Sequence, residues 1–258
     1  MDETNSFEWM RRDKWHIPKF HEFQTAMEKS KKECVDLTKM SELVLTLGCT
    51  LIAFLKVPSF FENDRYISER YSQSLVFTCF IEFLRSSVCT VFLCGCGLYK
   101  NAYHNIRYAL ESIIQSSYLD SSHPNSNFLT KIEILKEVED LPEYRGVQLV
   151  KKLDIAYKKE TRKGLIKEYR KLSKRVHSTH RQFVATASNF MERSYSSVYV
   201  DCSEVSNIYD SMKILYNIFF LLFLTHFPEL RKPLKENNEF VETVKSHNLT
   251  LLLKVLRI

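Results

Sequence analysis

Glycine and proline are both scarce in this chain. Only five glycines and six prolines occur among its 258 residues, so few positions supply the tight turns that a many-stranded sheet requires. The same shortage excludes the glycine-rich phosphate-binding loops of kinases and Rossmann folds. Hydrophobic residues still make up 45% of the chain, enough to bury a sizeable core. We therefore expect an all-α protein, a bundle of about six to eight helices.

Patterns of metal ligands are also missing. The pair Cys94-Gly-Cys96 is too short for a zinc knuckle, and no CxxC pair accompanies it. His177 and His180 lie three apart, but no Glu-x-x-His or HExxH stretch supplies the carboxylates of a metal-dependent enzyme. The seven cysteines fall mostly in apolar helical runs, where cysteine acts as a small hydrophobic residue. We predict a reduced, cytoplasmic setting with no bound metal and no cofactor.

Two apolar stretches invite comparison with membrane spans. Residues 75–98 are long enough, but they contain Glu82 and Arg85, which are costly at the centre of a bilayer. Residues 214–227 are more apolar but number only 14, short of the roughly 20 that a span requires. The polar residues 1–19 do not resemble a signal peptide. We expect two buried core helices and no stable membrane insertion.

Apolar residues recur at helical spacing along most of the chain. Pro58 and Pro228 end two of the helices, and residues 120–127 form the clearest loop. The stretch Gly95-Cys96-Gly97 is expected to break or kink the helix that precedes it. Asp201, followed three residues later by Glu204, is typical of a capping box that opens a helix. The segments with helical spacing are residues 20–55, 62–94, 99–119, 128–139, 142–153, 163–180, 205–222 and 239–256.

These helices suggest three parts. Residues 1–97 form an N-terminal arm and a helical pair, residues 98–226 a helical core, and residues 227–258 a C-terminal peripheral helix. The apolar positions of residues 205–222 alternate in steps of three and four, which suits either the centre of the core or a helix paired across a dimer.

Positive charge is concentrated in one region. Residues 145–181 contain thirteen Lys or Arg against three acids, for a local net charge of +10, so the rest of this +6 chain carries −4. Clustered basic residues indicate a surface that contacts phosphate, although a solvated helical face or an anionic membrane surface would use the same residues. The candidate phosphate ligands are Lys167, Lys171, Lys174, Arg175, His180 and Arg181.

One face of the basic helix combines three useful side chains. Arg170 and His177 are seven residues apart and return to nearly the same face, with Ser173 between them. An unperturbed histidine titrates near pH 6.5 and can act as a general base or acid, while an arginine can neutralise charge on a phosphoryl group. Arg107 and Glu111, four apart on another helix, either form an internal ion pair that orders two helices or line the same cleft.

Three short motifs together resemble the HEPN superfamily of helical domains. They are Arg170 and His177 separated by six residues, the upstream run Asn105-Ile106-Arg107-Tyr108-Ala109-Leu110-Glu111, and a Tyr-x-x-Leu-Ser-x-x-x-His signature that starts at Tyr169. The resemblance covers residues 98–226. It implies a dimer in which two Arg–His motifs form a composite, metal-independent ribonuclease site, with Arg170 and His177 as the catalytic pair. Many members act as toxins or in antiviral defence, and others bind nucleic acid or a protein partner without catalysis.

Two main hypotheses follow. The first is a metal-independent endoribonuclease of a toxin or antiviral-defence type, acting as a homodimer on RNA, with Tyr169, Ser173, Arg107 and Glu111 supporting the catalytic pair. The second is a non-catalytic helical module that binds RNA, a nucleotide, an antitoxin or another protein partner. A purely structural scaffold built on residues 205–222 is a third hypothesis.

Overall fold

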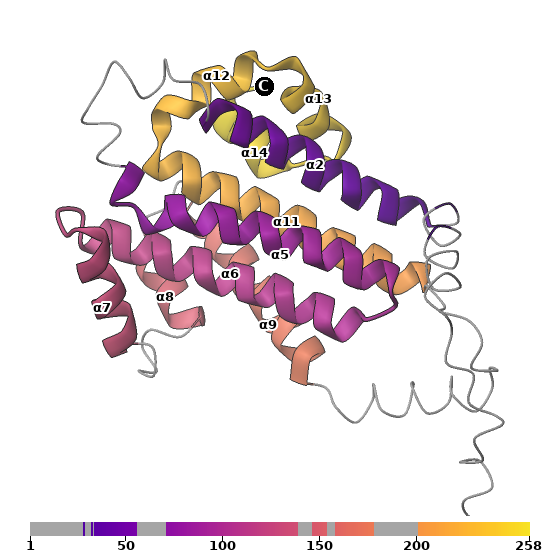
Figure 1. Cartoon of the computed structure of the whole chain (residues 1–258), viewed down its shortest axis with the longest axis horizontal. Coiled ribbons are helices and arrows are strands. Elements are labelled where there is room, and N and C mark those ends of the chain that lie inside the picture. The colour runs from indigo at the N-terminus through magenta and orange to yellow at the C-terminus, as the bar shows by residue number, and fades with distance from the viewer. Residues whose placement is uncertain are drawn as a thin grey trace, which may run out of the picture.

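A computed structural model describes residues 34–55, 71–138, 146–153, 158–177 and 201–258, together with positions 28 and 32. Within these residues every regular element is helical, comprising ten α-helices and one 3-10 turn (Figure 1). The prediction of an all-α bundle is confirmed. The helices outnumber the expected six to eight, because the C-terminal segment folds as several short helices instead of one.

The longest described helix, α11 (Cys202–His226), runs through the centre of the bundle. It contacts α2 (Val35–Leu55), α5 (Leu75–Gly95), α6 (Tyr99–Ser122), α9 (Lys158–His177) and α14 (Thr250–Leu256). All ten residues of 215–224 are buried, as expected of a helix that is apolar nearly all round. Of the two roles predicted for residues 205–222, α11 takes that of the central core helix.

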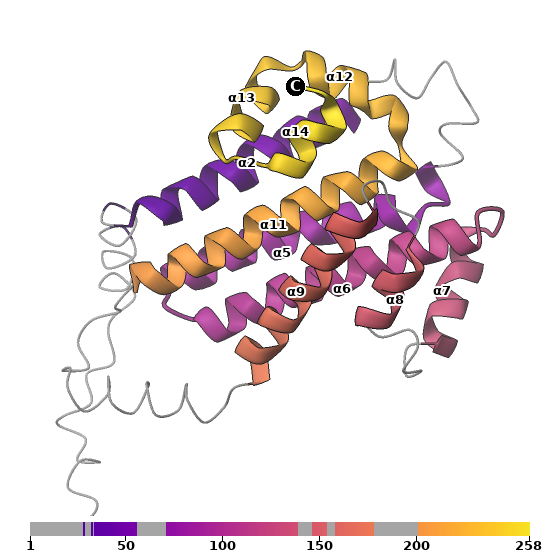
Figure 2. The ribbon, with the colours of Figure 1, turned by 180° about the vertical axis from the view of Figure 1, so that it is seen from behind.

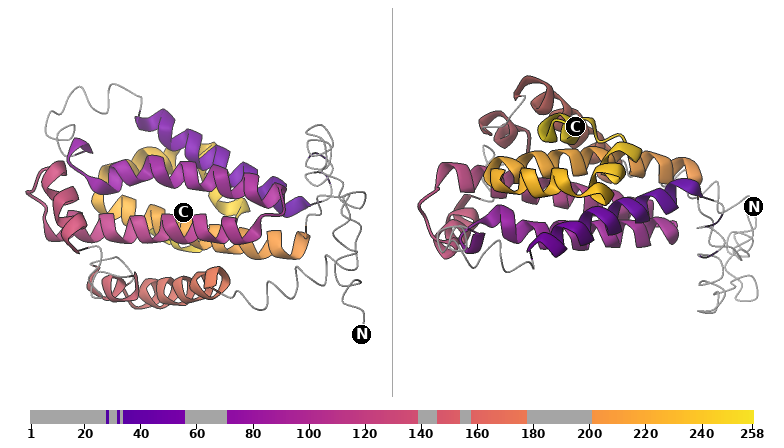
Figure 3. Two further views of the ribbon diagram at one scale, coloured as in Figure 1. Left: turned by 60° about the horizontal axis from the view of Figure 1, so that its bottom comes forward. Right: turned by 90° about the horizontal axis from the view of Figure 1, so that it is seen from above.

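Helices α5 and α6 form an antiparallel pair on one side of α11, and α2 crosses α5 (Figures 1 and 3). The predicted break at Gly95-Cys96-Gly97 is confirmed, since α5 ends at Gly95 and Gly97 takes the left-handed conformation with φ of 71°. Gly48 of α2 lies against α5, where an added Cβ would lie 2.8 Å from Cδ2 of Leu84 and would require that side chain to shift. Phe83 of α5 stacks on Phe219 of α11 with ring centroids 4.1 Å apart.

Helix α9 packs mainly on α6 and also contacts α11, and α8 (Gly146–Lys152) lies against both α6 and α9 (Figure 2). Helix α7 (Phe128–Val138) packs beside α6. Helices α12 (Arg231–Glu236), α13 (Asn238–Ser246) and α14 close the bundle over α2 and α11. The sequence predicted a single helix over residues 239–256. The structure interrupts it between Ser246 and Thr250, where Asn248 has a φ of 52°.

Two other boundaries differ from the predicted ones. Helix α6 continues through Ser122 into the predicted 120–127 loop, because Asp120 is buried and bonded to neighbouring helices. Helix α9 starts at Lys158, earlier than the expected residue 163, and its described part ends at His177. The helical spacing of residues 20–33 and 62–70, apart from position 28 and position 32, falls outside the described residues.

Helices α5 and α11 are both long and apolar enough to cross a membrane by length and composition alone. Within α11, 78% of an apolar stretch of 18 residues is buried in the bundle, whereas only 44% of the corresponding stretch of α5 is buried. The predicted role of core helix is thus confirmed for α11. Helix α5 packs on one side only and leaves Ile81, Val88 and Phe92 exposed, so the absence of membrane insertion stays a prediction.

Candidate functional site on the basic helix

Helix α9 presents opposite edges to the core and to solvent. Its inner edge is formed by Thr161, Leu165, Glu168 and Leu172, all of which are buried. The outer edge carries four exposed positions in steps of four, three and four, a spacing that places them in a single row along a helix. We call these four residues the outer basic row; they are Lys163, Lys167, Arg170 and Lys174.

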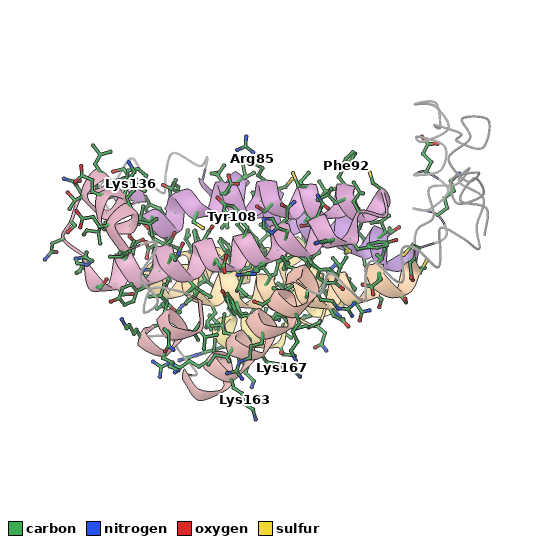
Figure 4. The ribbon with its side chains drawn as sticks, turned by 90° about the horizontal axis from the view of Figure 1, so that it is seen from below. Arg85, Phe92, Tyr108, Lys136, Lys163 and Lys167 are labelled. Carbon is green, nitrogen blue, oxygen red and sulfur yellow. The ribbon has the colours of Figure 1, made fainter. Side chains whose placement is uncertain are left out.

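The cations of the outer basic row point away from the bundle. Figure 4 shows Lys163 and Lys167 at the lower edge of the view, directed away from the other helices. Within the described part of the chain, none of the four cations makes a hydrogen bond or ion pair. They are therefore available to an external anion. His177 holds the next backbone position of this row and closes α9. Its side chain, with His180 and Arg181, lies outside the described residues.

Two predicted phosphate ligands have protein partners instead. Lys171 donates a 3.0 Å hydrogen bond to Ser211 of α11 and lies 3.7 Å from the Glu168 carboxylate. Arg175 pairs with Glu204 of α11 at 2.9 Å. Both cations extend from the flank of α9 that contacts α11, so they fix α9 to the core. Their predicted role as phosphate ligands is untested.

Ser173 lies at a different depth from Arg170. Its Oγ is buried and finds no hydrogen-bond partner among the described residues, whereas Arg170 is exposed. At about 100° per residue, the two positions are separated by about 60° around the helix axis. They share one side of α9, as predicted, but no hydrogen bond joins them.

Arg107, Glu111 and Tyr169 meet between α6 and α9. Arg107 donates to Oε1 of Glu111 at 3.1 and 3.2 Å, which confirms the predicted internal ion pair. The Tyr169 hydroxyl donates to the same oxygen at 2.7 Å, and the Arg107 guanidinium lies 5.4 Å from the centroid of the Tyr169 ring. Burial, together with the Glu111 carboxylate, raises the pKa of Tyr169, so its hydroxyl remains a hydrogen-bond donor.

A second cluster of the same composition lies nearer the start of α6. Tyr103 donates to Glu204 at 3.0 Å, Arg175 pairs with the other oxygen of Glu204, and the Arg175 guanidinium lies 5.4 Å from the centroid of the Tyr103 ring. Sequence reasoning missed Tyr103, although it sits four residues before Arg107 on the same helix. We call the two clusters the Tyr169 clamp and the Tyr103 clamp.

The predicted cap of α11 is only half a capping box. Asp201 accepts hydrogen bonds from the backbone N–H groups of Ser203 and Glu204, as expected of an N-cap. The Glu204 side chain, however, belongs to the Tyr103 clamp, and the Asp201 N–H donates to the Tyr99 hydroxyl instead. A residue that a local pattern assigns to helix capping therefore serves to hold three helices together.

Among the residues that the structure describes, no group of three or more His, Cys, Asp or Glu side chains converges as a metal site would require. Comparison of the chain with protein-family models, curated proteins and solved structures gives no match. The described helices and the outer basic row define an all-helical protein with a row of exposed cations along α9.

Proposed function

We propose that this protein is a HEPN-like helical bundle that binds RNA through the outer basic row of α9. The observation that carries the proposal is the row itself: four exposed cations that have no partner within the part of the chain that the structure describes. At a rise of about 1.5 Å per residue, the row places a cation roughly every 5 Å along about 16 Å of helix. A line of separate cations suits the repeating charge of a nucleic-acid backbone, which binds by counterion release.

The test is the salt dependence of RNA binding. Fluorescence anisotropy of a labelled single-stranded RNA should show log affinity falling with log salt by about 0.7 per phosphate contact. A Lys167→Glu, Arg170→Glu, Lys174→Glu triple variant should lose about tenfold or more in affinity and flatten that slope. The matched control reverses three other exposed lysines, Lys232, Lys235 and Lys245. Equal losses in both triple variants would show that net charge alone drives binding and would refute the proposal.

A second candidate function is metal-independent RNA cleavage. It is favoured by an exposed Arg170 seven residues before His177 on one helix, the spacing that resembles the HEPN motif. In this reaction His177 removes the proton of a ribose 2′-hydroxyl, which attacks the adjacent phosphorus. Arg170 stabilises the charge that develops on the phosphoryl oxygens. The P–O5′ bond breaks, a proton is delivered to the 5′ oxygen, and a 2′,3′-cyclic phosphate forms.

Cleavage and binding are separable by experiment. An active protein should cut single-stranded RNA in EDTA, leave the 2′-deoxy analogue intact, and lose cleavage but retain binding in a His177→Ala variant. A homodimeric mass in solution is expected, because the proposed site combines two copies of the motif. Full cleavage by His177→Ala would refute the catalytic role. Salt-dependent binding without any cleavage would leave the non-catalytic RNA-binding module as the function.

A further inference from the structure

A pocket of about 450 Å³ is lined by residues from the start of α5, the connection between α6 and α7, and the end of α11. These three segments lie at one end of the bundle (Figure 1). Its lining includes Gln73, Asp120, Asn127 and Lys131, and no residue of α9. Two of these side chains form a buried ion pair, since Lys131 is 3% exposed and its Nζ lies 2.8 Å from Oδ1 of Asp120. A volume of this size is within the range of small-molecule sites.

The acceptor capacity of Asp120 is already used. Its Oδ1 accepts from the Leu75 N–H at 3.1 Å and from Lys131, and its Oδ2 accepts from Ser74 Oγ at 2.6 Å and the Val76 N–H at 3.0 Å. A carboxylate offers about four lone-pair positions, and these four donors fill them. Asp120 therefore caps α5, and its carboxylate has no free lone pair with which to accept a hydrogen bond from a ligand.

Donors in the same pocket are not all used. The Lys131 ammonium has three N–H groups but only two acceptors among the described residues, Asp120 and the backbone carbonyl oxygen of Gln73 at 2.9 Å. Asn127 uses its Oδ1 to accept from the Thr130 N–H at 2.9 Å, and its amide NH₂ has no partner among the described residues. Gln73 uses its Oε1 to accept from the Phe128 N–H at 2.7 Å, and within the described segments its NH₂ donates only to Ser72 Oγ, at 3.5 Å.

We infer that this pocket binds a small oxyanion, a carboxylate or a phosphate monoester, held by the spare N–H of Lys131 and the amide groups of Asn127 and Gln73. Gln73 and Asn127 are exposed, so water reaches their amide donors in the free protein, and a ligand rich in acceptors would replace that water and also bond Lys131. The N-terminus of α7 opens at Asn127, and the positive end of its dipole favours an anion there. The site is separate from the outer basic row, and it does not depend on RNA binding.

Two isosteric substitutions test the site without removing the caps of α7. Asn127→Asp and Gln73→Glu each keep the oxygen that accepts the α7 backbone N–H, and aspartate caps a helix as well as asparagine. Each replaces the NH₂ donor with a negatively charged oxygen. Lys131 is left in place, because its removal would leave Asp120 buried and unpaired. The matched control, Asn238→Asp, makes the same charge change at an exposed position of α13.

Isothermal titration of the full chain with inorganic phosphate and with succinate provides the measurement. We expect at least one probe to bind, and Asn127→Asp and Gln73→Glu each to weaken that binding by about tenfold or more. Asn238→Asp should leave the affinity within about twofold. Binding of phosphate alone identifies a phosphate monoester as the ligand class, and binding of succinate alone identifies a carboxylate.

Three results would overturn the inference. The first is that neither phosphate nor succinate gives a heat of binding at millimolar concentration. The second is unchanged affinity in Asn127→Asp and Gln73→Glu. The third is loss of binding in the Lys167→Glu, Arg170→Glu, Lys174→Glu variant, which would assign the anion to α9. Because that variant is also the test of RNA binding, the failure of one proposal can be told from the failure of the other.

Discussion

The hydroxyl of Tyr169 in α9 donates a 2.7 Å hydrogen bond to the Glu111 carboxylate in α6. That carboxylate also holds Arg107, so one acidic group orients a tyrosine and an arginine from two helices. The Tyr103 clamp repeats this arrangement nearer the start of α6 and adds α11. Two clamps along one helix fix the rotation of α9 about its axis, and that rotation turns the outer basic row to solvent.

The first prediction concerns the Tyr169 clamp. Tyr169→Phe keeps the ring beside Arg107 but removes a hydrogen bond to a charged acceptor, so the free energy of unfolding should fall by about 1–2 kcal/mol. Urea denaturation measures the change. Tyr108→Phe on the exposed side of α6 should leave the stability unaltered. RNA affinity should not change in either variant, and a large loss with Tyr169→Phe would mean that the hydroxyl contacts RNA.

The buried ion pair between α6 and α7 carries the second prediction. Asp120→Asn removes one of two accepting oxygens and leaves the Lys131 ammonium buried without its counter-charge. The free energy of unfolding should fall by about 3–5 kcal/mol. Asp210→Asn provides the comparison, because Asp210 pairs with Lys213 at 2.7 Å in an exposed position. Asp210→Asn should change the free energy of unfolding by less than about 1 kcal/mol. Equal losses for Asp120→Asn and Asp210→Asn in urea denaturation would contradict the prediction.

A buried histidine gives the third prediction. His247, which follows α13, is 4% exposed and hydrogen-bonded to the Tyr209 hydroxyl. Burial lowers the pKa of His247 below its ordinary value of 6.5; Glu42 opposes this shift, and Lys213 and Lys39 add to it. The folded state therefore binds fewer protons than the unfolded state between the two pKa values. The contribution of His247 to the free energy of unfolding is therefore fully present above about pH 6.5. It is lost as the pH falls toward the lowered pKa of His247.

Urea denaturation at several values between pH 7.5 and pH 5 measures this loss. His247→Asn should remove the part of the pH dependence that comes from this side chain. His104→Asn, at an exposed position on α6, should retain the pH dependence of stability that the wild type shows. Identical pH profiles for the wild type and His247→Asn would show that the histidine does not contribute.

Most helices could be predicted because their signals are local. The apolar spacing of α11, the break at Gly95-Cys96-Gly97 and the stop before Pro228 depend only on neighbouring residues, and the structure has all three. Asp120 could not be placed in the same way. Its polar surroundings predict a loop, but its partners Ser74, Leu75 and Val76 lie more than 40 residues earlier, and no local pattern reveals that pairing.

The candidate site, like the fold, could be predicted only where its signals are local. The four-residue spacing of Arg107 and Glu111 predicts their ion pair, and the charge count finds α9. Neither signal says which basic residues face inward. Lys171 and Arg175 lie among the clustered cations of the sequence, yet contact with α11 gives both of them protein partners. That orientation follows from tertiary packing, which the composition of a helix does not contain.

The last prediction separates these two kinds of cation with neighbouring residues. Lys174→Met removes an exposed cation of the outer basic row, so stability should change by less than about 0.5 kcal/mol. Its RNA affinity should fall, and the salt slope should decrease by about 0.7, the value of one phosphate contact to a single strand. Arg175→Met removes the same charge but leaves Glu204 with only its Tyr103 hydrogen bond and no cationic partner among the described residues, so it should lose about 1–2 kcal/mol of stability.

Urea denaturation and anisotropy on both variants complete the comparison. We expect Lys174→Met to be impaired in RNA binding but not in stability, and Arg175→Met to be impaired in stability but not in RNA binding. Equal losses of RNA affinity would mean that Arg175 leaves Glu204 to meet the phosphate, and the phosphate-binding surface would then include the flank of α9 that contacts α11. Since the two substitutions carry the same charge change one residue apart, a difference between them comes from the direction in which each side chain points.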